Sequence, residues 1–146
     1  MKKILALVLA LAMMAVLACS AIAEQPTYHF EIVSKGFQST YWQAVLKGTE
    51  ARTKEINDEA GYEKITFQFV GPDAESNVAQ QVSQFESAVN ASPAAIGFAA
   101  VDQEAFVDLI AQAQSKNIPI IGFDSGVPGA PEGAVYANAS TDNYAA

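Results

Sequence analysis

Strand-like and helix-like patterns of hydrophobic residues alternate along the chain from residue 28 onward, with short connections between them. Alternating apolar and polar side chains predict strands, and apolar residues three or four positions apart predict helices. Strands are predicted, in chain order, at residues 28–34, 65–69, 94–101, 118–123 and 134–138. Helices are predicted at residues 42–60, after residue 73 and between residues 102 and 117, and another begins near residues 141–142.

Polar residues ahead of the second and third predicted helices indicate where those helices begin. Asp73 can cap the second helix, with Glu75 in its first turn, and Asp102 can cap the third. Each predicted helix also has an apolar stripe that should face the core. The stripes are Trp42, Val45, Leu46, Thr49 and Ile56 in the first helix, Val78, Val82, Phe85 and Val89 in the second, and Phe106, Leu109, Ile110 and Ala113 in the third.

The alternation of strands and helices predicts βαβ units, a parallel sheet and right-handed crossovers. The strands at residues 94–101 and 118–123 are apolar on both faces, which is typical of central strands. The strand at residues 65–69 alternates strictly and therefore suits an edge. We expect an α/β fold with a doubly wound parallel sheet of strand order 2-1-3-4-5, flanked by helices.

The first 23 residues have the pattern of a signal peptide. Lys2 and Lys3 precede an uninterrupted apolar run at residues 4–17, which is short for a membrane span. Cleavage after Ala23 would release a free domain of residues 24–146, whereas the lipobox-like residues 16–19 would make Cys19 a lipidated N-terminus. The sequence leaves both open, and either product would be exported to the periplasm or cell envelope.

Charge and cysteine content limit the kinds of partner and of covalent cross-link expected for the exported domain. After residue 23 the chain has six basic and 16 acidic residues, which gives a net charge of −10. This charge argues against nucleic acid or an anionic membrane as a partner, and it favours a neutral or cationic ligand. Cys19 is the only cysteine, so no internal disulfide is expected.

Motifs for catalysis and cofactor binding are missing from the sequence. No G-x-G-x-x-G, G-x-x-x-x-G-K-[ST] or G-x-S-x-G follows a predicted strand. The lone histidine, His29, leaves little for a hydrolytic triad, and with one cysteine a Cys/His metal site is excluded by count. We therefore expect a binding protein with no cofactor and no metal, rather than an enzyme.

Loops at the carboxyl ends of parallel strands open on one edge of the sheet, where ligands of such folds bind. The loops after the predicted strands contain hydroxyls, amides, carboxylates and two adjacent aromatic residues, Tyr41 and Trp42. Carboxylates and amides can hydrogen-bond vicinal hydroxyls, and an aromatic face can cover the C–H side of a sugar ring. This mixture predicts a carbohydrate site. Asp124 is its leading polar candidate because no helix follows for it to cap.

Four segments of the chain resemble one family of binding proteins. They read FEIVSKGFQSTYWQAVLKGTEA from residue 30, AAIGFAAVDQEAF from residue 94, AQSKNIPIIGFDSGVP from residue 113 and YANASTDNYAA from residue 136. In these segments the chain is similar to the N-terminal lobe of the ribose/galactose-type periplasmic binding proteins, the substrate-binding components of sugar ABC importers. The resemblance runs from about residue 30 to residue 146.

The resemblance implies roles for individual residues. Residues 38–42 lie where the family has a polar residue followed by aromatics that contact the sugar. Asp124 falls on the family's sugar-binding Asp or Asn, and Ser125 replaces the arginine of ribose binders, which argues against ribose. Asp142 matches a segment near the family's hinge. The implied ligand-binding residues are Gln38, Ser39, Tyr41, Trp42, Asp124, Ser125 and Asp142.

The resemblance also implies partners and an architecture. The family captures a small sugar or polyol outside the cytoplasm and delivers it to an ABC permease in the membrane, and we expect a monomer. Its members close two lobes on the ligand, so this chain would be one periplasmic-binding-protein-like lobe with the second lobe missing. An isolated lobe should bind weakly, because half of the contacts are absent.

Two other functions share this core. The first is ligand sensing, in which the bound sugar or signal molecule is presented to a chemoreceptor or a sensor kinase, and the sequence does not separate it from import. The second is transcriptional repression by related cytoplasmic proteins that carry a DNA-binding headpiece. The leader and the acidic charge of this chain argue against repression.

Overall fold

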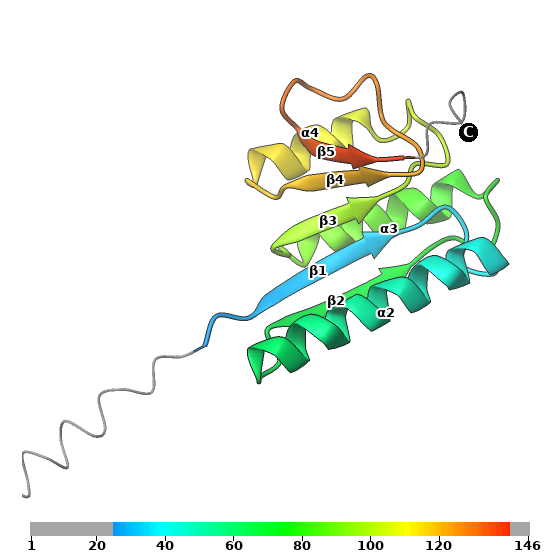
Figure 1. The fold of residues 1–146 in the computed structure, drawn as a ribbon. Coiled ribbons are helices and arrows are strands. Elements are labelled where there is room, and N and C mark those ends of the chain that lie inside the picture. The colour runs from blue at the N-terminus through cyan, green and yellow to red at the C-terminus, as the bar shows by residue number, and fades with distance from the viewer. Residues whose placement is uncertain (1–24, 141–146) are drawn as a thin grey trace, which may run out of the picture.

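The computed structural model describes residues 25–140, which contain a five-stranded sheet and three helices. The elements are β1 (Tyr28–Val33), α2 (Thr40–Ala60), β2 (Ile65–Val70), α3 (Val78–Asn90), β3 (Ala95–Phe98), α4 (Val107–Ser115), β4 (Ile120–Phe123) and β5 (Val135–Ala139). All strand pairs are parallel, and the strand order is β2-β1-β3-β4-β5 (Figure 1). The predicted doubly wound sheet is therefore confirmed, with β2 at the edge that its alternation indicated.

The two faces of the sheet are covered unequally. On one face α3 and α4 enclose the main core, in which the rings of Phe85, Phe98 and Phe106 pack together at centroid distances of 4.6–5.8 Å. Ile96 and Ile120 of the central strands are fully buried in the same core. On the other face, within the described part of the chain, α2 is the single helix and it lies beside β1 and β2 (Figure 1).

The ends of α2 are fixed by residues that suit helix termini. The Ser39 hydroxyl accepts a hydrogen bond from the backbone N–H of Tyr41 (3.3 Å), as an N-cap residue does. Gly61 ends the helix in the left-handed conformation, which a glycine adopts without steric cost. The Asn57 side chain then hydrogen-bonds both the N–H and the C=O of Ile65 at 2.8 Å. The C-terminal turn of α2 therefore fixes where β2 begins.

The predicted start of α3 was wrong. Asn77, and not Asp73, caps this helix, because its side chain accepts a hydrogen bond from the backbone N–H of Gln80 (3.2 Å). The backbone N–H of Asp73 instead donates to the Gln80 side chain (3.1 Å). Residues 73–76 thus form turns ahead of the helix, and Glu75 does not lie in its first turn.

Asp102 does not cap α4, as was predicted, but stabilises a turn before this helix. Its carboxylate accepts hydrogen bonds from the backbone N–H groups of Glu104 (2.9 Å) and Ala105 (3.1 Å). These bonds stabilise a turn that precedes α4, and Phe106, the N-cap residue of α4, makes no side-chain cap. The predicted buried face of this helix is confirmed, since Phe106, Leu109, Ile110 and Ala113 are all buried.

Gln81 is a fully buried polar residue in the first turn of α3, which the sequence pattern did not reveal. Its Nε2 donates to the carbonyl oxygens of Ser34 and Ala99, both at 2.8 Å. Its Oε1 accepts a hydrogen bond from the backbone N–H of Val101 (2.9 Å). One side-chain amide therefore joins the segments that leave β1 and β3, just beyond the carboxyl ends of both strands.

We expect Gln81→Ala to lower the free energy of unfolding by about 2–4 kcal/mol, because it removes three hydrogen bonds and leaves buried backbone groups without partners. Urea denaturation followed by circular dichroism measures this loss. Gln112→Ala, at an exposed position of α4, is the matched control and should change stability by less than about 0.5 kcal/mol. Equal effects of the two substitutions would contradict the role assigned to Gln81.

Candidate functional site

Asp124 follows β4 directly and has an unusual backbone conformation. Its φ is +61°, in the left-handed region that Asp and Asn tolerate better than other residues with a side chain. A hydrogen bond from the N–H of Ser125 to the C=O of Phe123 (2.7 Å) closes a tight turn around it. The N–H of Asp124 donates to Ala139 of β5 (2.9 Å), so both sides of the turn are anchored. The position of this carboxylate is therefore set by the backbone.

Three side chains meet the Asp124 carboxylate, and together the four residues form what we call the Asp124 cluster. The Lys35 ammonium lies 2.8 Å from Oδ2 of Asp124. The hydroxyls of Tyr41 and Ser125 each donate to the carboxylate at 3.4 Å. The single hydrogen of the Ser125 hydroxyl is shared with the backbone carbonyl of Ala100 (3.1 Å), and this contact connects the loops after β3 and β4. The cluster is built from the loop after β1, the first turn of α2 and the loop after β4, at the carboxyl edge of the sheet.

The two adjacent aromatic residues have different surroundings. Tyr41 is 55% exposed, whereas Trp42 is only 2% exposed. The Trp42 indole packs edge-on against Tyr41 (centroid distance 4.8 Å) and Phe123 (5.9 Å), and its Nε1 donates to the Glu75 carboxylate (2.8 Å). Trp42 thus supports Tyr41 from beneath, and Tyr41 is the ring that presents an open face.

The remaining predicted site residues are placed as follows. Gln38 is exposed in the turn before α2, and Ser39 is engaged as the N-cap of that helix. Asp142 and Cys19 lie outside the described residues.

Lys35 was missed by the sequence analysis, although it directly follows the Ser34 that closes the first predicted strand. Glu75 was considered only as a residue of a helix turn, and its bond to Trp42 could not be found from sequence spacing. The structure joins two of the predicted residues, Tyr41 and Ser125, directly to Asp124.

The Asp124 cluster offers both signs of charge at one small exposed place. A carboxylate accepts hydrogen bonds from hydroxyl groups, and an ammonium donates to their oxygens. The open Tyr41 ring can cover an apolar ring face. Residues 25–140 contain no group of three or more His, Cys, Asp or Glu side chains that could hold a metal ion. No helix in the same part of the chain has the length and hydrophobicity to cross a membrane.

Residues 30–146 match the model of one protein family, described as periplasmic binding protein domain. The match covers most of the chain and includes every residue of the Asp124 cluster. A comparison with curated proteins finds no match.

Three solved structures illustrate the similarity to known folds. A Brachyspira murdochii protein described as an ABC transporter, LacI family transcriptional regulator is 42% identical, with a TM-score of 0.69, over 82% of this chain and 35% of that one. An Agrobacterium vitis ABC transporter solute-binding protein with bound D-fucose is 33% identical, with a TM-score of 0.66, over 80% and 38%. An Agrobacterium radiobacter carbohydrate transporter solute-binding protein in complex with D-arabinose is 32% identical, with a TM-score of 0.63, over 84% and 37%. The chain therefore spans 35–38% of the length of these proteins.

The backbone at Asp124 predicts which substitutions the site can accept. Asp124→Asn should keep the thermal stability close to that of the wild type, because Asn also adopts a positive φ readily. Asp124→Val should lower the free energy of unfolding by about 1–3 kcal/mol, because a β-branched residue is strained there. Chemical denaturation of the two variants measures the difference. Equal losses would show that the ion pair with Lys35, and not the backbone, sets the stability at this position.

Proposed function

Because the chain belongs to the periplasmic binding protein domain family, whose members bind solutes and are not enzymes, we propose that it forms one lobe of an extracytoplasmic sugar-binding protein. In this proposal the complete protein captures a monosaccharide or polyol and delivers it to an ABC permease. The observation that carries the proposal is the Asp124 cluster at the carboxyl edge of the sheet.

The position of the cluster supports a ligand role. In open parallel sheets, ligands bind outside the carboxyl ends of the strands. The turn around Asp124 holds its side chain at that edge with a positive φ, and such backbone strain is concentrated at functional sites. Asp124 and Lys35 also remain partly exposed, with 31% and 21% of their side chains accessible. A sugar hydroxyl can therefore reach both groups without unfolding of the loops.

The chemistry of the cluster supports an aldose as the ligand. Two of the similar proteins were solved with monosaccharides, D-fucose and D-arabinose. Asp124 would accept hydrogen bonds from one or two sugar hydroxyls, Lys35 would donate to a hydroxyl or ring oxygen, and Tyr41 would cover one face of the ring. Ser125 is a short neutral donor in place of an arginine, so we do not expect ribose.

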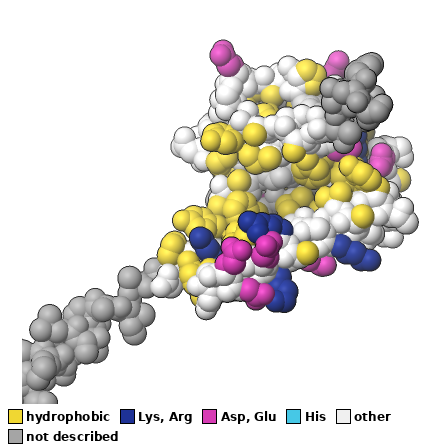
Figure 2. All heavy atoms as spheres, viewed as in Figure 1, with side chains coloured by type: hydrophobic (Ala, Val, Ile, Leu, Met, Phe, Trp, Pro, Cys, Tyr) yellow, Lys and Arg dark blue, Asp and Glu magenta, His cyan; other side chains and the backbone are white. Residues whose placement is uncertain are grey.

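The uncovered face of the sheet supports the proposal that this chain is one part of a longer protein. Beside α2, a hollow of about 490 Å³ is lined by apolar side chains of β1 and β2 that include Phe30, Ile32 and Phe67. Figure 2 shows hydrophobic side chains gathered in the hollow above the charged surface of α2. Exposed apolar patches of this kind mark surfaces that another segment or partner covers. We propose that the rest of a two-lobed protein covers this hollow.

The pattern of the first 23 residues supports export of this lobe. An exported protein can meet its sugar before the sugar crosses the membrane, as an importer requires. A free product that begins after Ala23 and a product lipidated at Cys19 both serve this function.

We expect D-arabinose or D-fucose to bind the full chain with a dissociation constant on the order of millimolar or weaker, because a single lobe supplies half of the contacts. Amide NMR spectra recorded during a sugar titration should show shifts at Lys35, Tyr41 and Asp124. Asp124→Asn should weaken binding by at least about tenfold, since it removes charge-assisted hydrogen bonds. Tyr136→Ala, which removes an exposed tyrosine outside the cluster, is the matched control and should not change binding. Absence of shifts with every aldose tested, or equal binding by Asp124→Asn, would overturn the site.

The apolar hollow beside α2 generates a separate prediction. The folded chain should bind the dye anilinonaphthalene sulfonate, and Val45→Glu should reduce the dye fluorescence, because Val45 lines the hollow. Ala79→Glu, at an exposed position of α3 outside the hollow, is the control and should leave the fluorescence unchanged. A wild-type chain that binds no dye under native conditions would contradict an uncovered face and, with it, the one-lobe proposal.

A further inference from the structure

The two edge strands of the sheet differ in regularity. β5, at one edge, has a register shift against β4 between Ile120 and Ile121, where Tyr136 is the extra residue. β2, at the other edge, pairs with β1 residue for residue from Ile65 to Val70. A bulge protects an edge strand, because it interrupts the row of backbone groups with which another strand could pair. The regular β2 edge does not have this protection.

The composition of β2 also favours pairing with another strand. Its six residues, ITFQFV, include no charged residue, proline or glycine. Natural edge strands commonly carry a charge or a proline, because such residues disfavour the addition of a strand. Short uncharged segments with high β-propensity are instead typical of strands that pair between chains. The β2 edge would therefore self-associate readily if it were fully open.

Alternate residues of β2 direct their backbone groups away from β1. The N–H of Tyr28 donates to the C=O of Lys64, and the N–H of Ser34 donates to the C=O of Val70, both at 2.8 Å. Backbone groups alternate in direction along a paired strand, so the even-numbered residues of β2 bond to β1 and the odd-numbered residues face the open edge. The edge-facing residues are Ile65, Phe67 and Phe69.

A side chain already occupies the first edge-facing position. The N–H of Ile65 donates to Oδ1 of Asn57, and Nδ2 of Asn57 donates to the C=O of Ile65, both at 2.8 Å. One side-chain amide thus makes the two hydrogen bonds that an antiparallel neighbouring strand would make. Asn57 belongs to α2, so this helix places a side chain where an added strand would run.

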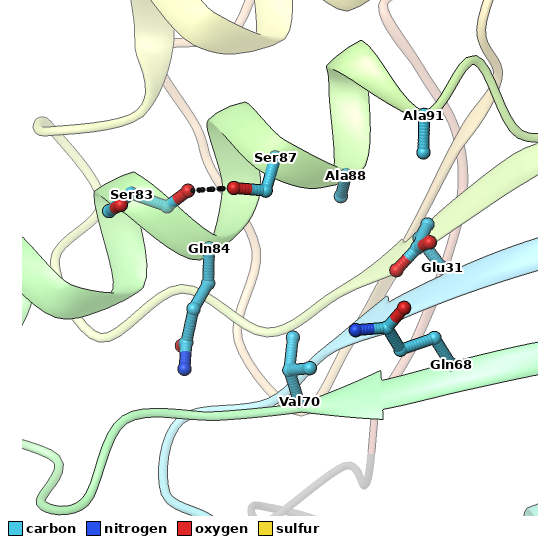
Figure 3. Close-up of a pocket in the computed structure, with 8 residues that line it drawn as sticks. All are labelled: Glu31, Gln68, Val70, Ser83, Gln84, Ser87, Ala88 and Ala91. Carbon is cyan, nitrogen blue, oxygen red and sulfur yellow. Dashed lines mark hydrogen bonds between the residues drawn. The ribbon is translucent and has the colours of Figure 1, made fainter.

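A second side-chain amide lies at the other end of β2. Nε2 of Gln84 donates to the C=O of Gly71, the residue directly after the strand, at 3.0 Å. Figure 3 shows Gln84 pointing from α3 toward the sheet. Between the two amides, Phe67 and Phe69 are the edge-facing residues that remain, and they span roughly 7 Å of strand.

We propose that Asn57 keeps the chain monomeric by preventing β2 from pairing with β2 of a second copy. With Asn57 in place, an added strand can pair only along residues 67–69, a segment shorter than most strands. Without Asn57, Ile65 becomes available and pairing can extend over the whole of β2. A second copy is the partner, because it presents the same regular and uncharged edge strand. This role is independent of the sugar-binding function proposed above.

The test is sedimentation velocity of the chain over a series of concentrations. Asn57→Ala should self-associate at concentrations at least about tenfold below any at which the wild type does, because the edge-facing groups of Ile65 are released. Gln81→Ala is the matched control and should remain monomeric, because it removes buried hydrogen bonds away from the β2 edge. Gln68→Lys, at an exposed position of β2, should restore the monomer when combined with Asn57→Ala, because a lysine on an edge strand disfavours pairing.

Hydrogen exchange in the wild type keeps the proposal falsifiable if Asn57→Ala fails to fold. The amide of Ile65 should exchange at least about tenfold more slowly than those of Phe67 and Phe69, because it donates to Asn57 and the other two face the open edge. Equal exchange at these three amides would overturn the proposal. It is also overturned if folded Asn57→Ala stays monomeric, if Gln81→Ala associates to the same extent, or if Gln68→Lys does not restore the monomer.

Discussion

The buried amide of Gln81 is the interaction on which the carboxyl edge of the sheet depends. Burial of an amide is unfavourable unless its hydrogen bonds are made, and here the segments that leave β1 and β3 supply all three partners. Lys35 follows Ser34, whose carbonyl Gln81 holds, and Ser125 is bonded to Ala100, beside the Ala99 that Gln81 also holds. The Asp124 cluster is therefore connected, through Ser34 and Ala99, to a fully buried amide.

The two faces of the sheet differ in how completely they are covered. In the core between the sheet, α3 and α4, the rings of Phe85, Phe98 and Phe106 are fully buried. The opposite face combines the apolar hollow beside α2 with Tyr41 and Phe123 near the carboxyl edge. The main aromatic core thus lies on one side of the sheet, and the apolar hollow lies on the other side.

The sequence was sufficient for the topology, because the hydrophobic periods of 2 and 3.6 residues depend on local side-chain direction. The sequence was insufficient to predict burial and helix capping where contacts between distant segments determine them. Gln81 looks like the polar border of an amphipathic helix, and only the approach of two backbone carbonyls shows that it is buried. Asp73 and Asn77 are equally suitable cap residues, and the turn at residues 73–76 selects Asn77. Tyr41 and Trp42 are adjacent in sequence, and the packing of Phe123 and Glu75 buries only the second.

The positive φ of Asp124 has a consequence for how such a site can diverge. Few residue types tolerate this conformation, so the position can change its charge, from Asp to Asn, but hardly its size or shape. A lineage that acquires a new ligand must therefore alter the residues around this fixed point. Residues 35 and 125 lie next to it without a positive φ, so they are free to carry that variation. The strained backbone at residue 124 thus restricts this position to Asp or a similar residue, whereas residues 35 and 125 can vary.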